Sequence, residues 1–280
     1  MFYLPFIGSF LEAAGMTIEK IMLKKKNLNF KNYTLYGFLS IVILMLPFIF
    51  FFWNIKPEAY SLKNILLMAF IIISALAANL LTYYALKREN LTAMEPIRLM
   101  QPMFTIILAI IIYSSERTNL LTIVLAIIAS LTLVFSHISK HHLKYDKYII
   151  AALFGSLFFS VELVASKPLL QYYNSTTFYF LRCLAILIIT AIIFRPKNKV
   201  DNKLKFTILL TSAMWIIYRI ILYYGYNSLG IIFTTILFIL TPVFTYIFAA
   251  IFLKEKITIK QIIATAVIIA CVVLAIVTQN

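Results

Sequence analysis

The chain consists of long apolar runs separated by short polar connections. Ten runs have about the 20 residues that a helix needs to cross ~30 Å of hydrocarbon at ~1.5 Å per residue. They cover residues 2–23, 33–53, 65–86, 91–113, 120–136, 148–171, 176–194, 206–226, 231–253 and 261–277. Polar and apolar residues do not alternate within the runs, which are also too long for buried strands. The pattern therefore predicts transmembrane helices and disfavours a membrane barrel.

The second half of the sequence repeats the first. A shift of 140 residues places the pair Tyr83-Tyr84 on Tyr223-Tyr224, and residues 102–105 on residues 242–245, without a gap. The polar stretch 139–147 predicts a linker between five-helix repeats at 1–138 and 148–280. Because five is odd, the second repeat enters the membrane from the opposite side. The predicted fold class is an all-α polytopic membrane protein with ten transmembrane helices in two inverted five-helix repeats.

Composition supports a membrane solvent. Of 280 residues, 63% are hydrophobic and 12% are charged, against about 45–50% and about 25% in soluble domains. The net charge of +15 does not indicate a nucleic-acid partner, because Lys and Arg lie in short connections between apolar runs. Cys183 and Cys271 lie inside apolar runs and are interpreted as small buried hydrophobes. The first run lacks a basic start and a cleavage site, so we expect a retained helix.

The distribution of Lys and Arg predicts an orientation. The connections after odd-numbered runs carry 17 of these residues, and those after even-numbered runs carry 3. Basic connections face the cytoplasm, so the charge bias places the odd connections inside and both termini outside. We expect the protein in the cytoplasmic membrane. Basic clusters such as 24–26 and 195–205 are expected to fix this orientation, or to touch anionic lipid.

Motifs at the same places in each half resemble a known family. The first half carries Tyr-Tyr-Ala-Leu at 83–86, Pro-x-Phe-Thr at 102–105 and Glu-Arg at 116–117, and the second half carries similar motifs at 223–226, 242–245 and 252–258. A Gly-Ser pair followed by Lys has the same spacing at 8–20 and 155–167. The chain resembles the drug/metabolite transporter superfamily, specifically its ten-helix EamA-like members. The resemblance implies a two-repeat bundle around a central cavity, and secondary transport of small metabolites or drugs. Family members usually place both termini in the cytoplasm, opposite to the charge bias.

Two acidic residues lie deep inside predicted helices. Glu12 is ten residues into the first run and Glu162 fourteen residues into the sixth. A charge at mid-bilayer costs at least ~2.5 kcal/mol, so each is a candidate functional residue. Small multidrug members of the superfamily have a first-helix Glu that exchanges protons for substrate, with a Lys spaced like Lys20 from Glu12. The resemblance implies such a proton role. The alternative is structural, with each acid paired to a basic group such as Arg219 or Arg98.

Other polar residues within the runs predict the walls of a cavity. Glu95, Arg98 and Gln101 share one helix side at three-residue spacing. Glu95 also fits a capping box, whereas Arg98 lies deeper and is interpreted as a cavity residue or the partner of a Glu. The remaining candidates lie in the third and eighth runs and are Asn79, Arg219, Trp215, Tyr218 and Tyr223. Arg219 can bind a substrate carboxylate or stack on an aromatic ring, whereas the aromatic residues can also be ordinary packing or interfacial residues.

Two prolines interrupt predicted helices. Pro102 and Pro242 each remove one backbone hydrogen bond, which predicts a hinge for alternating access or a static kink. Thr105 and Thr245 are expected to bond the freed carbonyls. Three further acids, Glu19, Glu116 and Glu255, lie at run ends and are interpreted as interfacial.

The leading hypothesis is a secondary active transporter of a small organic solute that works by alternating access, with possible proton coupling. An uncoupled uniporter or exchanger is the alternative, followed by a non-transporting scaffold. No enzyme motif or deep histidine occurs, so an enzyme is disfavoured. We expect no cofactor and no metal, because the linker histidines at 137–142 lie among Lys residues in a solvated loop. The expected partners are a solute, lipid and protons, and the expected state is a monomer or weak homodimer.

Overall fold

The computed structural model describes residues 3–23, 29–88, 97, 100–137, 147–194, 201–252 and 257–279. The regular elements in these ranges are helical, apart from one isolated bridge between Ile55 and Tyr173. The first half contains α1 (Leu4–Leu23), α2 (Phe30–Phe52), η1 (Pro57–Tyr60), α3 (Leu62–Arg88), α5 (Met100–Ile112), η2 (Ser114–Arg117) and α6 (Leu120–His137). The second half contains α7 (Lys147–Ser166), η3 (Leu169–Gln171), α8 (Ser175–Phe194), α9 (Asn202–Ser228), α10 (Ile231–Phe238), α11 (Thr241–Phe252) and α12 (Ile259–Gln279).

Long apolar helices agree with a polytopic membrane protein. Within the described ranges, 7 helical segments are long and apolar enough to cross a membrane, and α5 and α6 are shorter apolar helices. The predicted count of ten crossings is not confirmed. One reason is that α1 carries three charged residues, and another is that the predicted run 91–113 is described mainly from Met100 onward. The predicted linker 139–147 also lies almost entirely outside the described residues.

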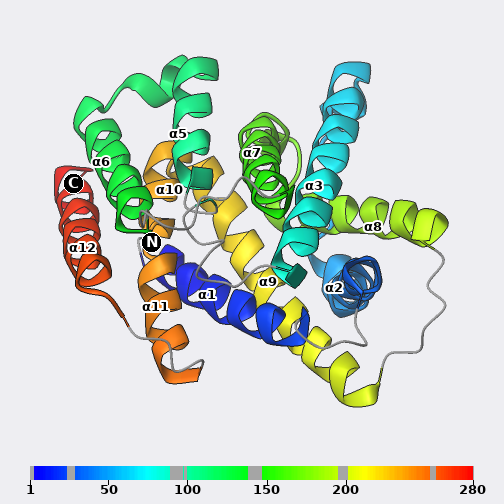
Figure 1. Cartoon of the computed structure of the whole chain (residues 1–280). Helices are drawn as coiled ribbons and strands as arrows, with labels where there is room; N and C mark the ends of the chain where they lie inside the picture. The colour runs from blue at the N-terminus through cyan, green and yellow to red at the C-terminus, as the bar shows by residue number, and fades with distance from the viewer. Residues whose placement is uncertain are drawn as a thin grey trace.

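The helices of the two halves pack against each other in pairs (Figure 1). Helix α3 packs on α7, α1 on α9, α2 on α8, and α6 on α12. Each pair joins one helix from each half of the chain. The cores of the two halves are therefore shared, and any cavity between these pairs has walls from both halves.

The sequence repeat is also present in the contacts. Ser9 on α1 donates a hydrogen bond to the carbonyl of Leu237, and Ser156 on α7 donates to the carbonyl of Ile97. The two serines occupy the matched Gly-Ser pairs, and the two acceptors are separated by the repeat offset of 140 residues. A Cβ atom at the neighbouring Gly8 would lie 2.6 Å from the Phe238 ring, so α1 passes close to α10. The first helix of each half thus makes the same kind of contact.

A break at the centre of the bundle replaces one predicted helix. The predicted run 231–253 forms two helices, α10 and α11, with a turn at Ile239 and Leu240. Pro242 has no N–H to donate to the carbonyl of Phe238, and the Val243 N–H donates to the Leu240 carbonyl instead. The prediction of one continuous helix is wrong here. Of the most apolar 18 residues of the α10–α11 segment 78% are buried, against 28% for those of α12, so the break lies in the interior.

The threonines near the prolines have a different role from the predicted one. Thr245 Oγ donates to the carbonyl of Thr241 at 3.0 Å, and Thr105 Oγ donates to the carbonyl of Gln101 at 3.0 Å. Each hydroxyl thus bonds the carbonyl four residues earlier. Pro242 frees the Phe238 carbonyl rather than that of Thr241, so the prediction that these threonines bond the freed carbonyls is wrong.

Two glycines provide a matched test of this packing. A Cβ at Gly225 on α9 would lie 2.6 Å from Thr234 on α10, whereas a Cβ at Gly37 on α2 meets nothing within 4 Å. We expect Gly225→Ala to lower the free energy of unfolding by about 1–3 kcal/mol, because overpacking forces α9 and α10 apart. Gly37→Ala should be neutral or stabilise by up to about 1 kcal/mol through helix propensity. Thermal unfolding in detergent measures both, and equal effects would contradict the packing.

Candidate functional site

Two polar cavities lie between the two halves of the chain. Glu12 lines the first cavity and Glu19 lines the second, so helix α1 forms part of the wall of both cavities. Seven residues separate these acids, which corresponds to ~10 Å along a helix. On α9 the neighbours Tyr218 and Arg219 face different cavities, Tyr218 the first and Arg219 the second. The interior therefore contains two chemically different polar regions close together.

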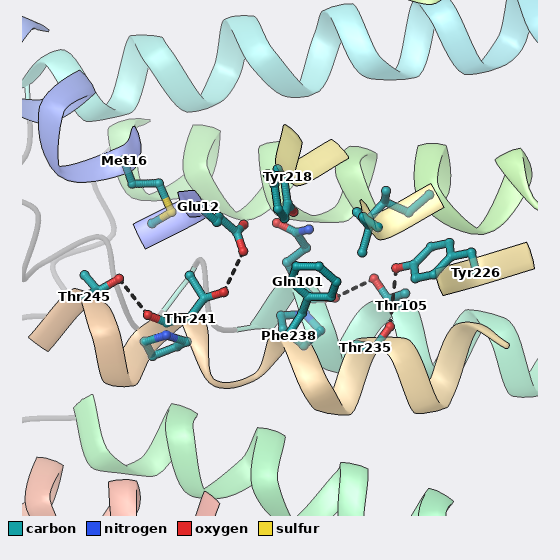
Figure 2. Close-up of a pocket in the computed structure, with 14 residues that line it drawn as sticks. Glu12, Met16, Gln101, Thr105, Tyr218, Tyr226, Thr235, Phe238, Thr241 and Thr245 are labelled. Atoms are coloured by element: carbon teal, nitrogen blue, oxygen red, sulfur yellow. Dashed lines mark hydrogen bonds between the residues drawn. The ribbon is translucent and has the colours of Figure 1, made fainter. Parts of the chain in front are cut away.

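The first cavity lies beside the break between α10 and α11 (Figure 2). Thr241 Oγ donates to the Glu12 carboxylate at 2.7 Å, and the Tyr218 hydroxyl is also hydrogen-bonded to Glu12. Gln101 and Pro102 from α5 line the same cavity, as does Pro242. Glu12, Gln101 and Tyr218 were all predicted site residues, and the structure brings them together here.

The second cavity contains a buried carboxylate that the sequence analysis misplaced. Glu19 was interpreted as interfacial, but only 3% of it is exposed. Its Oε1 atom accepts hydrogen bonds from Tyr33 at 2.8 Å, from Tyr83 at 3.3 Å and from the indole of Trp215 at 2.8 Å. The interpretation is wrong because α2, α3 and α9 each contribute a donor that covers the end of α1. The predicted residues Asn79 and Trp215 both line this cavity.

A buried ion cluster joins α7, α8 and α9. Glu162 is ion-paired with Arg182 and, at 3.4 Å, with Arg219, and it also accepts a hydrogen bond from the Tyr223 hydroxyl. All four residues are buried, with at most 4% of each exposed. Arg182 further donates to the Tyr223 oxygen at 2.7 Å. The structural alternative for Glu162, an ion pair with Arg219, is thus present in this conformation.

The two arginines of this cluster also line the second cavity. Within the described part of the chain, the buried Arg182 Nε atom has no hydrogen-bond partner. Aromatic rings cover both guanidinium groups, with Tyr179 over Arg182 at 5.0 Å and Phe159 over Arg219 at 5.3 Å. One carboxylate thus faces two guanidiniums, so this end of the cavity favours an additional anionic group. Glu19 lines the same cavity.

A third polar cluster ties the halves together at one face. Glu116 on η2 accepts the backbone N–H groups of Ile231 at 2.9 Å and Ile232 at 3.0 Å, which form the N-terminus of α10. Lys167, just after α7, forms an ion pair with the same carboxylate. We call Glu116, Lys167 and these two N–H groups the Glu116 latch. Glu116 lies at a helix end, as the sequence analysis predicted, but only 6% of its side chain is exposed because of these partners.

The surroundings of the Glu116 latch are fitted closely to it. Gly230 precedes α10 with a φ of +88°, and a Cβ there would lie 3.2 Å from Glu116 Oε1. A side chain at this position would therefore be strained and would crowd the carboxylate. Burial, and then the Glu116 charge, raise the pKa of Tyr113 to about 12, so its hydroxyl stays protonated. That hydroxyl donates to the Val164 carbonyl at 2.9 Å, a further link between the halves.

Some candidate residues fall outside these clusters. Glu95, Arg98 and Glu255 lie outside the described residues. Lys20 is buried and donates to the carbonyl of Leu86 at 2.8 Å, at the edge of the second cavity. Arg182 was missed as a site residue, although a charge seven residues into a predicted helix is itself a signal of function.

The comparisons with known proteins agree with this architecture. A model of the EamA-like transporter family matches residues 2–137 and, a second time, residues 146–277. A solved structure titled "Crystal structure of protein" has 13% sequence identity and a TM-score of 0.72 over 99% of each chain, which shows a shared fold. The search of curated proteins finds no match. Because two copies of the family model together cover nearly the whole chain, the protein belongs to the EamA-like transporter family.

Proposed function

We propose that this membrane transporter is a secondary active transporter that moves a small organic solute across the cytoplasmic membrane by alternating access. The observation that carries the proposal is the second cavity, which is buried between the two halves and lined by groups of both charges. Isolated charges are costly in a membrane interior and persist there where they are paired or used. Helices from both halves provide these groups, so a relative motion of the halves would change access to them.

The chemistry of the second cavity favours a solute with both charges. Arg182 and Arg219 at one end suit a carboxylate, because guanidiniums bind it with two parallel hydrogen bonds. Glu19 at the other end suits a protonated amine. The aromatic residues Phe159 and Trp215 in the same lining suit an apolar body between these groups. The proposed solute is therefore a small zwitterion, such as an amino acid.

Cavity size supports a change of shape during transport. The first cavity has a volume of about 60 Å³ and the second about 50 Å³, whereas pockets for small organic ligands measure about 300–1,000 Å³. Solute binding in the second cavity thus requires the halves to separate. The Glu116 latch favours the closed arrangement at one face, and the α10–α11 break provides a point at which the helix can bend.

The position of the Glu116 latch fits helices that cross the membrane in alternating directions. Lys167 follows α7, Glu116 follows α5, and Ile231 follows α9, so three connections of the bundle meet there. The connection after α2 lies beside the start of α8, where the Asn174 side chain donates to the Phe52 carbonyl. These are the connections after the even-numbered predicted runs, and such runs end on one face if the chain crosses ten times as two inverted repeats.

Of the two acids predicted to respond to protons, Glu12 is the one we propose for coupling to an ion gradient. Neutralising Glu162 would leave Arg182 and Arg219 buried without their carboxylate, at a cost of about 3–5 kcal/mol. Glu12 lines the first cavity, whereas these two arginines line the second. Flux that ignores every imposed ion gradient would favour the uncoupled uniporter or exchanger instead.

Three matched probes test the proposed solute class. L-leucine carries both charges, isocaproate lacks the amine, and isoamylamine lacks the carboxylate. We expect L-leucine to raise the Tm of the purified protein most and to undergo counterflow in proteoliposomes. Arg219→Lys should weaken its apparent Kd at least ~10-fold, because bidentate binding is lost. The exposed Arg117 provides the control Arg117→Lys. A preference for isoamylamine would contradict the proposal.

Hydrogen exchange tests the Glu116 latch. In Glu116→Gln the ion pair with Lys167 is lost and the charge-assisted bonds to the N–H groups of Ile231 and Ile232 weaken. We expect amide exchange in residues 230–234 to accelerate about tenfold, which corresponds to about 1.4 kcal/mol of local opening. Glu58→Gln alters an exposed acid at the same face and serves as the control. Unchanged exchange in Glu116→Gln would show that the latch does not hold the two halves.

A further inference from the structure

We propose that the arginine side of the second cavity binds a chloride ion in the closed arrangement, through N–H groups of Arg219, Arg182 and Asn79, and that the carboxylate of the solute displaces this ion. The displacement rests on the proposed function, whereas binding of the ion can be measured without any transport. Three features support the site: guanidinium donors without a described partner, a neighbouring amide donor, and the size of the cavity.

The two guanidinium groups use only part of their hydrogen-bonding capacity. Arg219 donates from Nη1 to Glu162 at 3.4 Å, and Arg182 donates from Nη1 to Glu162 and to Tyr223. A guanidinium has five N–H donors on three nitrogen atoms. Within the described ranges, the Nε and Nη2 atoms of both arginines make no hydrogen bond, although at most 4% of either residue is exposed. Buried donors of this kind are rare and call for a bound water or ion.

A water molecule would satisfy these donors but not the charge beside them. The two guanidiniums share the single carboxylate of Glu162, and a buried charge without a counter-charge is costly. A monovalent anion supplies an acceptor and a negative charge together. The Glu19 carboxylate lines the same cavity, and its Oε1 atom accepts hydrogen bonds from two tyrosines and from Trp215. These contacts leave the guanidinium donors to another anion.

Asn79 adds a neutral donor from the other half of the chain. Asn79 on α3 and Arg219 on α9 occupy matched positions of the repeat, and both line the second cavity. The Asn79 Nδ2 atom donates to the Ala75 carbonyl at 2.7 Å, and its second N–H remains for an anion. The rings of Tyr179 and Phe159 cover the two guanidiniums. These aromatic surroundings favour a singly charged ion over sulfate or phosphate, because a doubly charged ion costs more to desolvate.

The size of the second cavity separates the ion from the solute. Its volume of about 50 Å³ exceeds the roughly 10–15 Å³ in which one water fits, but it is far below the about 300–1,000 Å³ of organic-ligand pockets. The closed arrangement can therefore hold an ion of about the size of a water molecule, whereas the solute requires the halves to separate. Once the halves separate, the carboxylate of the solute takes the same donors. Chloride thus stabilises the closed arrangement and competes with the solute.

The fluorescence of Trp215 reports ion binding directly. Trp53 and Trp215 are the two tryptophans of the chain, so Trp53→Phe leaves only Trp215, which lines the cavity one helical turn before Arg219. Iodide quenches an indole that it contacts. The purified full-length protein is titrated with sodium iodide against sodium sulfate at constant ionic strength, and sodium chloride is then added. We expect saturable quenching that chloride reverses. Quenching that rises linearly, or that chloride does not reverse, would overturn the ion site in favour of water.

Matched variants in the Trp53→Phe background locate the ion. Arg219→Gln should remove the saturable quenching, whereas Arg117→Gln, at an exposed arginine on η2, should keep it. Asn79→Ala should weaken the apparent Kd for chloride about tenfold, because a hydrogen bond to a charged group is lost. Asn64→Ala makes the same change at a buried amide of α3 outside the cavity and should leave the Kd unchanged. If Arg219→Gln is not monodisperse, the two asparagine variants decide. Unchanged halide binding in the cavity variants would refute the site.

Competition with the solute tests the displacement separately. Chloride at ten times its Kd should raise the apparent Kd for L-leucine about tenfold, by mass action. An unchanged Kd for L-leucine would refute the displacement. Chloride-reversible quenching without L-leucine counterflow would refute the proposed transport of this solute and support the ion site. Counterflow without chloride-reversible quenching would refute the ion site alone.

Discussion

The contact between Glu162 and the guanidiniums of Arg182 and Arg219 sets the arrangement of the interior. Three charged groups are buried together on helices α7, α8 and α9, with at most 4% of each residue exposed. Loss of one partner from a buried pair costs about 3–5 kcal/mol, so these helices are held in one register around the cluster. Tyr223 adds its hydroxyl to the same carboxylate. The second cavity has its positive end because this cluster contains one more cation than anion among the residues described.

The repeated tyrosine pair makes the same kind of hydrogen bond to a carboxylate in both halves, but the other partners of the carboxylate differ. Tyr83 donates to Glu19 on the first helix of its half, and Tyr223 donates to Glu162 on the first helix of the other half. In one case the carboxylate accepts hydrogen bonds from tyrosine and tryptophan side chains, and in the other it is paired with arginines. Glu19, Arg182 and Arg219 therefore line one cavity, although Tyr83 and Tyr223 occupy matched positions of the repeat. The repeat supplies the architecture, and the differences between its copies supply the chemistry.

The lengths of the apolar runs predicted the helices, because they are a local property of the sequence. The motifs that recur at an offset of 140 residues predicted the two-repeat fold and the family, because both copies are visible in the sequence. The break between α10 and α11 was not predicted, since a proline can bend or interrupt a helix and the surrounding packing decides which occurs. Glu19 was misplaced because its depth was judged from its position near the end of a run. Its cover comes from Tyr33, Tyr83 and Trp215 on three other helices. Glu116 was missed for a similar reason, because its partners lie 51 and 115 residues away.

The central claim is that the polar interior opens alternately to the two sides of the membrane. The most direct measurement uses one cysteine at Ser212, a buried residue that lines the second cavity, in a chain whose Cys183 and Cys271 are replaced. The protein is reconstituted in vesicles and exposed to a membrane-impermeant thiol reagent added from one side at a time. The account predicts that reagent from either side labels Ser212→Cys, and that L-leucine slows both reactions. Labelling from one side only, or from neither side, would contradict it.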